Sequence, residues 1–316
     1  MKTILIAGAG QLGSRHLQGV KSSKNQLDIW VYDLSNESLK VAEERYNQVE
    51  SQNKTVHFVT SLDLVPSKLD VVIVATGSKP RAAIIKQILA SKSVIYMVLE
   101  KFLFPRLAEY QEIEKLIQKN GVRTWVNCPR RMWEGYKMIA GYINKDKPVI
   151  FKYIDTDWGL CCNTVHYLDI FMWLNGCNSF SVNIDHLIPV VVESKRQGYV
   201  ELHGTEQFET HSGSVLTLTS TTESVPNPLV VIDNADTNIQ YNEATGSITI
   251  NGNIFNVPVH YQSGLSGLLV DEILESGNCP LTRYNESASY HKAYLQVIAP
   301  YINKLMGCSS DSCPIT

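Results

Sequence analysis

Apolar runs alternate with amphipathic segments through the first 126 residues. Residues 4–7 are apolar and lead into a Gly-rich stretch, after which apolar positions recur with helical spacing from about Leu12. The same alternation predicts further strands over residues 27–33, 69–76, 94–100 and 122–127 and further helices over residues 35–49, 79–91 and 106–120. Strands and helices that alternate in this way predict an α/β domain built on a doubly wound parallel sheet with right-handed crossovers.

The pattern changes near Asn127, and from Pro148 on the polar and apolar positions alternate singly. Asn, Gly, Asp and Pro turns separate short strands, which are predicted over residues 149–157, 179–187, 198–205, 214–221, 229–234, 238–243, 247–251 and 254–260. Helices are predicted near residues 164–174, 264–275 and 286–304. The sequence therefore predicts two domains, residues 1–126 and residues 127–316. The second is an α+β domain with an open, mostly antiparallel sheet, and its last helix packs back on the first domain.

Composition and charge narrow the possible functions. The net charge of −3 and the lack of a Lys/Arg run argue against binding to nucleic acid or to a membrane surface. The apolar run at the start is too short for a signal peptide, and no later stretch approaches a membrane span. Seven cysteines without paired zinc spacing predict no metal site and reduced thiols in the cytoplasm. Cys308 and Cys313 are expected in a frayed polar tail.

The Gly-rich stretch GAGQLG has the spacing of a dinucleotide-binding turn. Gly8 would permit the tight turn, Gly10 would let the backbone approach a pyrophosphate, and Gly13 would let the helix pack on the strand. Asp33 ends the second strand about twenty residues later, where a carboxylate accepts hydrogen bonds from the adenosine ribose and repels a 2′-phosphate. The turn and Asp33 predict NAD as the cofactor, with NADP left open. The alternative for Asp33 is a surface residue that caps the next helix.

Four ordered motifs carry a resemblance that covers nearly the whole chain: GAGQLG, IVATGSKPRAAII, VLEKFLF and WGLCCNTVHYLDIFMWLNG. With them the chain resembles the glucose–fructose oxidoreductase/inositol dehydrogenase/MocA family. The resemblance implies a Rossmann domain followed by an open-sheet domain that carries the substrate pocket. It also implies NAD(P)-dependent hydride transfer at a hydroxyl or carbonyl of a sugar, cyclitol or sugar nucleotide, with surface-glycan or carbohydrate metabolism as the setting. Some relatives are regulators without turnover. The implied cofactor contacts are Gly8, Gly10, Gln11, Leu12, Gly13, Asp33, Thr76, Gly77, Ser78 and Glu100.

Glu100, Lys101 and Phe102 match the Glu-Lys-Pro motif of that family. The resemblance implies that Lys101 contacts the reacting oxygen and assists proton transfer, while Glu100 helps to place the nicotinamide end. An ammonium suits this role because it stabilises the alkoxide charge that develops as a hydroxyl is oxidised. The alternative is a solvated lysine at a strand end. Phe102 departs from the family pattern, which often has a proline and a rigid turn at this position.

The helix motif also departs from the family pattern. Many members have an Asp four residues before a His and a second Asp three residues after it. Here His166 and Asp169 are kept, but Cys162 occupies the first Asp position and Asn163 follows it. A neutral thiol is a poor base, so either Lys101 and His166 suffice for proton transfer or Asn163 binds the substrate in a different pose. The alternative for His166 is a core histidine, and Asp169 is expected to support helix packing.

Further residues are expected around the substrate. Arg130 and Arg131 offer guanidinium forks for a phosphate or carboxylate, or one of them pairs with Glu134. Trp158 and Tyr261 are expected on sheet positions that line the pocket. The predicted partners are a small sugar-like substrate and further copies of the chain. The homodimer or homotetramer is expected to form through the uncovered face of the open sheet, which is expected to be apolar.

Overall fold

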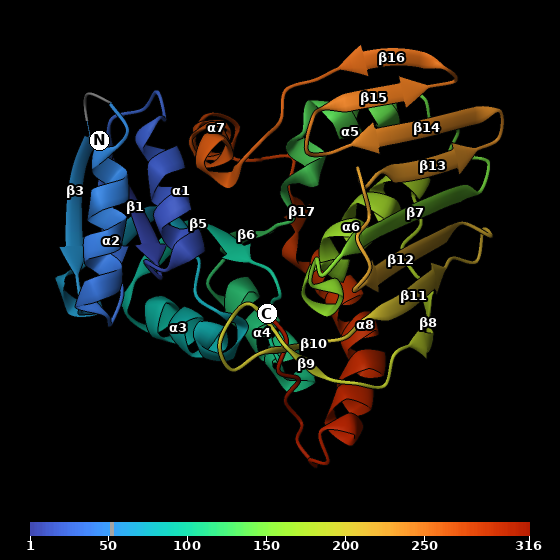
Figure 1. Cartoon of the computed structure of the whole chain (residues 1–316). Coiled ribbons are helices and arrows are strands. Elements are labelled where there is room, and N and C mark those ends of the chain that lie inside the picture. The colour runs from blue at the N-terminus through green and yellow to red at the C-terminus, as the bar shows by residue number, and fades with distance from the viewer. Residues whose placement is uncertain (51–53) are drawn as a thin grey trace. The chain divides into compact units, whose positions relative to one another are not determined.

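The computed structural model describes residues 1–50 and 54–316, and these residues form two compact units (Figure 1). Unit 1 comprises Met1–Phe104, Ala108–Pro129 and His260–Asn285. Unit 2 comprises Pro105–Leu107, Arg130–Val259 and Glu286–Thr316. Residues 260–285 thus cluster with the first unit, although the sequence boundary places them in the second domain. The packing of the last helix on the first domain stays a prediction.

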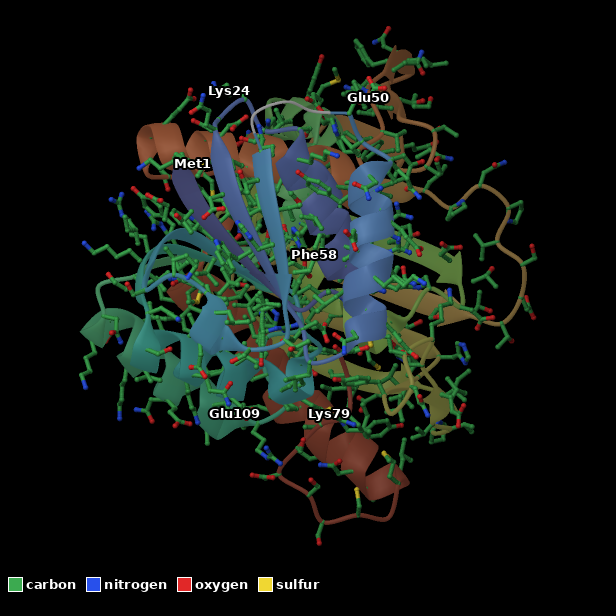
Figure 2. All side chains as sticks on the ribbon, turned by 90° about the vertical axis from the view of Figure 1, so that its left-hand side faces the viewer. Met1, Lys24, Glu50, Phe58, Lys79 and Glu109 are labelled. Carbon is green, nitrogen blue, oxygen red and sulfur yellow. The ribbon has the colours of Figure 1, made fainter. Side chains whose placement is uncertain are left out.

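Unit 1 is built on a seven-stranded sheet in the order β17-β6-β5-β4-β1-β2-β3. All neighbours are parallel except β17 and β6, which confirms the predicted doubly wound fold. Figure 2 looks onto the β3 edge of this sheet, with Phe58 labelled on that strand. The strands are β1 (Lys2–Ala7), β2 (Leu27–Tyr32), β3 (Lys54–Val59), β4 (Lys68–Val74), β5 (Ser93–Glu100), β6 (Arg123–Asn127) and β17 (Thr282–Arg283).

The helices of unit 1 pack on a sheet whose central strands are apolar on both faces. In β4, four consecutive residues from Val71 to Val74 are fully buried, as expected for a strand that is covered on both sides. Helix α1 follows β1 and packs against α7, which returns to this unit from late in the chain. The helices are α1 (Gln11–Lys21), α2 (Asn36–Asn47), α3 (Ser78–Ser91), α4 (Leu107–Lys119) and α7 (Gln262–Ser276).

Unit 2 contains an eight-stranded sheet in the order β16-β15-β14-β13-β7-β12-β11-β8. Only β7 and β12 run parallel, so the predicted mostly antiparallel sheet is confirmed. Its strands are β7 (Val149–Thr156), β8 (Ser181–Leu187), β11 (Gly204–Glu209), β12 (Val215–Thr221), β13 (Val230–Asn234), β14 (Thr237–Asn242), β15 (Ser247–Ile250) and β16 (Asn253–Asn256). The short strands β9 (Val192–Glu193) and β10 (Val200–Glu201) pair separately, and the helices are α5 (Glu134–Ala140), α6 (Leu160–Asn175) and α8 (Tyr284–Leu305).

The apolar face of this sheet is covered within unit 2. Helix α6 packs against β7 and β12, and Leu216 and Leu218 are fully buried beneath it. The alternate positions Thr217 and Thr219 are half-buried, and Lys152 on β7 is exposed. The uncovered face is therefore a mixed surface of threonine, lysine and scattered isoleucine. The expectation of an apolar uncovered face is corrected, because alternation along each strand directs the apolar side chains toward α6.

The last residues of the chain are buried in unit 2. Cys313 and Ile315 are fully buried, and the Cys313 N–H donates to the Pro105 carbonyl at 2.9 Å. The Pro314 carbonyl accepts from the Val200 N–H at 2.8 Å. The expectation of a frayed tail is therefore wrong for Cys313, because backbone hydrogen bonds and apolar burial fix this segment, whereas Cys308 is exposed. None of the helices in the described residues is both long and apolar enough to cross a membrane.

Candidate cofactor and active site

Of the three glycines in the turn between β1 and α1, only Gly10 has open space where a side chain would be. Gly8 has a φ of +101°, and a Cβ on Gly13 would lie 1.7 Å from the Gly8 carbonyl oxygen, so both positions require glycine for the turn itself. A Cβ on Gly10 would meet no heavy atom within 4 Å. Gly10 immediately precedes α1, whose first N–H groups attract anions. The space at Gly10 and the adjacent helix N-terminus fit a dinucleotide pyrophosphate.

Asp33 lies directly after β2 and faces this turn. Its Oδ2 accepts from the Ala9 N–H at 2.7 Å, and its Oδ1 accepts from the Ser35 N–H at 2.9 Å. The next helix is capped by Ser35, whose hydroxyl accepts from the Ser38 N–H at 3.2 Å. A carboxylate has about four acceptor positions, so the half-buried Asp33 retains positions for ribose hydroxyls.

The other residues that are predicted to contact the cofactor lie around the same Gly-rich turn. The position of a Cβ on Gly8 is 2.9 Å from the Thr76 backbone nitrogen, so the turn after β4 touches the Gly-rich turn. Thr76 and Gly77 are half-buried, and Ser78 is the first, buried residue of α3. Gln11 is exposed and Leu12 half-buried at the start of α1. The structure thus brings the predicted cofactor residues together at the carboxyl ends of β1, β2 and β4.

Two residues that the sequence analysis missed, Arg45 and His16, hydrogen-bond to predicted cofactor residues. Arg45 on α2 donates to the Gln11 side-chain oxygen at 2.7 Å and to the Ser14 hydroxyl at 2.5 Å. His16 is fully buried on α1, and its Nε2 lies 2.8 Å from Glu100 Oε1. The sequence does predict that His16 is buried, because Gly13, His16 and Val20 lie on the helix face that packs on the sheet.

Glu100 ends β5 in a buried polar network. Its Oε1 also accepts from Asn127 Nδ2 at 2.6 Å, and His16 Nδ1 lies 2.9 Å from the Ser266 hydroxyl on α7. Burial alone would raise the pKa of Glu100, but the hydrogen bond and charge of His16, with Asn127 and the charge of Arg81, lower it below its ordinary value. An ionised, immobilised carboxylate therefore stands at the end of β5.

Lys101 follows Glu100 and is only 7% exposed, so it is not the solvated strand-end lysine of the alternative interpretation. The next residues, Phe102 and Leu103, are fully buried, and the Lys101–Phe102 peptide bond is cis. Buried Arg81 on α3 donates hydrogen bonds to the carbonyl oxygens of both residues. Lys101 thus lies at the same sheet edge as the cofactor residues, in a loop whose backbone accepts hydrogen bonds from Arg81.

In unit 2, the predicted substrate residues gather at the start of α6. Trp158 precedes the helix and donates through its ring nitrogen to the Thr219 carbonyl at 2.9 Å, and Asn163 Nδ2 donates to the Trp158 carbonyl at 2.8 Å. His166, in the second turn, is half-buried. Cys162 is 6% exposed. The structure therefore brings Trp158, Cys162, Asn163 and His166 to one end of one helix.

A carboxylate that the sequence analysis missed lies at the same helix end. The oxygens of buried Glu201 accept from the N–H groups of Cys161 and Cys162 at 2.8 and 3.2 Å. Gly159 just before α6 has a φ of +76°, and a Cβ there would lie 3.2 Å from Glu201 Oε1. Glu201 thus satisfies N–H groups that a helix N-terminus leaves unpaired.

The predicted arginines form ion pairs with other carboxylates of unit 2. Arg131, which is 8% exposed, pairs with Asp169 through Nε at 2.8 Å and Nη2 at 3.1 Å. Arg130 pairs with Glu243 in the same two-point manner, at 2.7 and 2.9 Å. These contacts accord with a packing role for Asp169, and substrate binding by Arg131 stays a prediction. Tyr261 is not a sheet residue: it precedes α7 in unit 1 and is 71% exposed.

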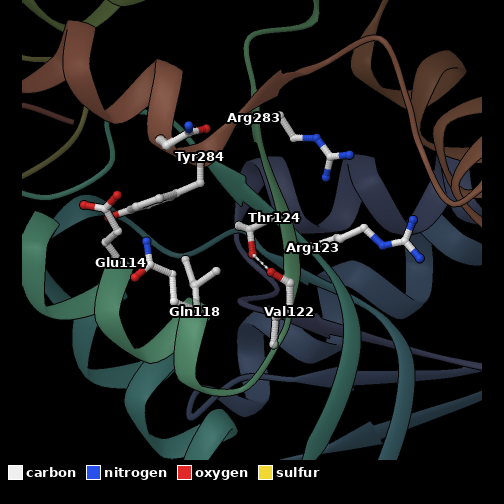
Figure 3. Close-up of a pocket in the computed structure, with 9 residues that line it drawn as sticks. Glu114, Gln118, Val122, Arg123, Thr124, Arg283 and Tyr284 are labelled. Atoms are coloured by element: carbon white, nitrogen blue, oxygen red, sulfur yellow. Dashed lines mark hydrogen bonds between the residues drawn. The ribbon is translucent and has the colours of Figure 1, made fainter.

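A cavity of about 270 Å³ lies at the start of β6, beside Arg123 and Thr124 (Figure 3). The predicted cofactor residues lie at the other, carboxyl ends of the parallel strands. The guanidinium groups of Arg123 and Arg283 extend away from Glu114 and Gln118 in this view. Arg123 donates to the Gly277 carbonyl at 2.8 Å, and Arg283 stacks over Trp125. None of the predicted cofactor or substrate residues lines this cavity. No group of three or more metal-ligating side chains occurs in residues 1–50 and 54–316.

Comparison with known proteins identifies the first part of the chain. Residues 2–128 match the model of a family described as an oxidoreductase family with an NAD-binding Rossmann fold. No curated protein matches the sequence.

Solved structures of similar fold cover both units. UDP-N-acetylglucosamine 3-dehydrogenase GnnA from Acidithiobacillus ferrooxidans is 14% identical, with a TM-score of 0.72 over 93% of this chain and 96% of that chain. An oxidoreductase from Agrobacterium radiobacter in complex with NAD⁺, L-tartaric acid and magnesium is 13% identical, with a TM-score of 0.72 over 96% and 97%. A super-repressor mutant of Gal80p from Saccharomyces cerevisiae is 13% identical, with a TM-score of 0.72 over 97% and 96%. At these identities the likeness is one of fold.

Proposed function

Because residues 2–128 belong to the NAD-binding Rossmann-fold oxidoreductase family that the sequence motifs indicate, we propose that this chain is an NAD-dependent dehydrogenase or reductase. Its substrate is a hydroxyl or carbonyl compound of the sugar, cyclitol or sugar-nucleotide class. One observation carries the proposal. A buried lysine, Lys101, follows an ionised glutamate at the end of β5, on the same sheet edge as the cofactor turn.

The position of Lys101 at the end of β5 suits a role in proton transfer to or from a bound substrate. Ligands of doubly wound folds bind at the carboxyl ends of the strands, where Lys101 lies. NAD, when bound, supplies the hydride acceptor. Oxidation of a hydroxyl also requires loss of its proton, and Lys101 stabilises the resulting oxygen charge and exchanges that proton. Phe102 and Leu103, the next residues of this loop, are buried.

The residues of the second unit are proposed to bind the substrate. His166 and Asn163 offer hydrogen bonds to substrate hydroxyls, and Trp158 offers an aromatic edge or face for a sugar ring. Cys162 replaces the familiar acid and is a poor base as a thiol, so proton transfer is assigned to Lys101 and His166. The name of the similar dehydrogenase GnnA, which cites UDP-N-acetylglucosamine, supports the sugar-nucleotide class.

A second candidate function is a regulator that binds NAD and a sugar without turnover. Two observations favour it over other non-enzymatic functions. Cys162 stands where many members of the family have an acid, and the fold is shared with Gal80p, a super-repressor mutant of which has been solved. In this alternative the cofactor turn is retained while the chemical step is lost.

The two functions are separated by measuring binding and turnover on the same preparation. Calorimetry measures NAD⁺ affinity, and the absorbance of NADH measures turnover with a panel of sugars, cyclitols and sugar nucleotides. We expect NAD⁺ binding together with steady NADH formation for one member of the panel. NAD⁺ binding with a bound sugar and no NADH formation would establish the regulator instead.

A further inference from the structure

Arg81 joins two loops of unit 1 from within the core. It is the fourth residue of α3 and has no exposed surface. Its Nη2 donates to the Thr76 carbonyl in the turn after β4. Its Nη1 donates to the Phe102 carbonyl and, at 3.0 Å, to the Leu103 carbonyl in the loop after β5. One guanidinium therefore holds the backbone of the two loops that follow the adjacent parallel strands β4 and β5.

A guanidinium is suited to this bridge for geometric reasons. Its donors lie in one plane at fixed angles, so bonds to one loop fix the direction of the bonds to the other. A buried cation is costly unless it is hydrogen-bonded, which makes the bridged arrangement the stable one. The charge of Arg81 also contributes to lowering the pKa of Glu100, so its influence reaches the residue beside Lys101.

The bridge continues to the cofactor turn through backbone contact. The Ala75 N–H, just before Thr76, donates to the Ala7 carbonyl, just before Gly8, at 2.8 Å, and a Cβ added to Gly8 would lie 2.9 Å from the Thr76 nitrogen. A continuous line of contacts thus runs from Gly8 through Thr76 and Arg81 to Phe102, which is bonded directly to Lys101. Contiguous packing and hydrogen bonds of this kind couple the mobility of two sites energetically. A ligand that reduces the mobility of the Thr76 turn then also reduces the mobility of the Lys101 loop.

We propose that Arg81 is a positioning residue that couples cofactor binding at the Gly8–Thr76 turns to the ordering of the Lys101 loop. NAD binding reduces the remaining mobility of the turn that contains Thr76, and Arg81 carries that change to residues 101–103. The inference rests on the proposed function insofar as it takes Lys101 to be the reacting group. The ordering itself depends only on NAD binding.

The first test uses hydrogen exchange of the wild-type chain with and without NAD⁺. We expect NAD⁺ to slow exchange in peptides that cover residues 75–82 and residues 99–104, each by at least about fivefold, the lower range of coupling between sites. Protection of residues 75–82 without protection of residues 99–104 would overturn the proposal. This test requires no variant to fold.

The second test removes the bridge. Arg81→Met keeps the length of the stem but has no donors, and Arg81→Lys keeps a charge that cannot bond both loops in one plane. Lys86→Met is the matched control, because Lys86 lies on the same helix in an exposed pair with Glu112. In Arg81→Met and Arg81→Lys, NAD⁺ should still protect residues 75–82 but should no longer protect residues 99–104. The control should behave as the wild type.

Failure of the coupling and failure of the proposed function are distinguishable. If NAD⁺ protects both segments in the wild type but no compound of the panel is turned over, the coupling stands and the enzyme assignment falls. If a substrate is found, Arg81→Lys should lower kcat more than it raises the Kd for NAD⁺. Retained protection of residues 99–104 in a folded Arg81→Met variant would show that Arg81 is a structural residue only.

Discussion

The three glycines of the first turn are required for different reasons. Gly8 supplies a backbone conformation that L-residues rarely adopt, and Gly13 allows close contact with the Gly8 carbonyl oxygen. Gly10 has an ordinary φ of −64° and open space beyond it. The structure therefore separates one glycine with space for a ligand from two that the fold itself requires, which is the division of roles that the motif predicts.

This distinction predicts opposite effects of the same substitution. Gly10→Ala should fold with an unchanged Tm but bind NAD⁺ at least about tenfold more weakly, because the methyl group occupies the space of the pyrophosphate. Gly13→Ala should lower the Tm, because its Cβ would lie 1.7 Å from a backbone oxygen. Thermal unfolding and calorimetry measure the two quantities. NAD⁺ affinity unaffected in Gly10→Ala would place the cofactor elsewhere.

Asp33 should determine the choice between NAD and NADP. Its carboxylate retains acceptor positions for ribose hydroxyls, and it would repel a 2′-phosphate. Asp33→Asn keeps an acceptor for one of the two backbone N–H groups and removes the charge. Loss of a charged hydrogen-bond partner costs about 1.5–3 kcal/mol, so NAD⁺ should bind roughly tenfold or more weakly while NADP⁺ binding improves. Tighter binding of NADP⁺ than NAD⁺ by the wild type would show the assignment to be wrong.

At this scale the sequence predicts the motif residues but not the residues that support them. Gly8, Gly13, Asp33 and Lys101 carry recognisable spacing. His16 and Arg81 lie at buried positions of helical patterns. Their partners include Glu100, 84 residues from His16, and the carbonyls of Phe102 and Leu103, 21 and 22 residues from Arg81. Such partners are set by the order of the strands, which no local pattern specifies.

At the scale of elements, most helices and strands follow from the apolar periodicity. Strand β3 (Lys54–Val59) and helix α5 (Glu134–Ala140) were not predicted, because β3 is only partly buried at the sheet edge and α5 is short. Residues 260–285 cluster with unit 1, whereas the boundary predicted from the sequence places them in the second domain. The local pattern predicts α7 as a helix but does not specify where it packs, because its contact with α1 joins segments far apart in the sequence.

The junction of β11 with α6 and α8 contains a carboxyl group with an altered pKa. Glu206 is fully buried and accepts hydrogen bonds from the Thr164 and Tyr294 hydroxyls at 2.6 and 2.5 Å. Burial raises its pKa from 4.5 to about 7, opposed in part by these two hydrogen bonds. Between those values the unfolded chain releases the proton while the folded chain keeps it. The free energy of unfolding therefore falls as pH rises through this window.

Glu206→Gln should remove this pH dependence. At about 1.4 kcal/mol for each pKa unit, the contribution of Glu206 amounts to about 3 kcal/mol between pH 4.5 and 7. The wild type should therefore lose stability relative to Glu206→Gln from about pH 4.5 to about pH 7, with no further divergence above that range. Urea unfolding at a series of pH values measures this. Parallel curves for the two proteins would mean that Glu206 is ionised in the fold.

At the scale of the whole molecule, the uncovered face of the second sheet is proposed to join copies of the chain. It carries Ile154, which is 46% exposed on β7, beside exposed Lys152. Light scattering at micromolar concentration should give about two or four times the chain mass of 35.4 kDa. Ile154→Lys should shift the protein toward monomer, whereas Leu34→Lys, at a 77% exposed position of unit 1, should not. A strictly monomeric wild type would refute this assembly.

The central claim is that Lys101 performs proton transfer in a hydride-transfer enzyme. Once the panel has identified a substrate, turnover and NAD⁺ affinity are measured on Lys101→Met, which keeps most of the stem but lacks the charge and the donors. Loss of one positioned acid–base group should reduce kcat by about 10²–10⁴-fold, while the Kd for NAD⁺ changes little because the pyrophosphate binds at the Gly-rich turn. Turnover within a few-fold of the wild type would contradict the account.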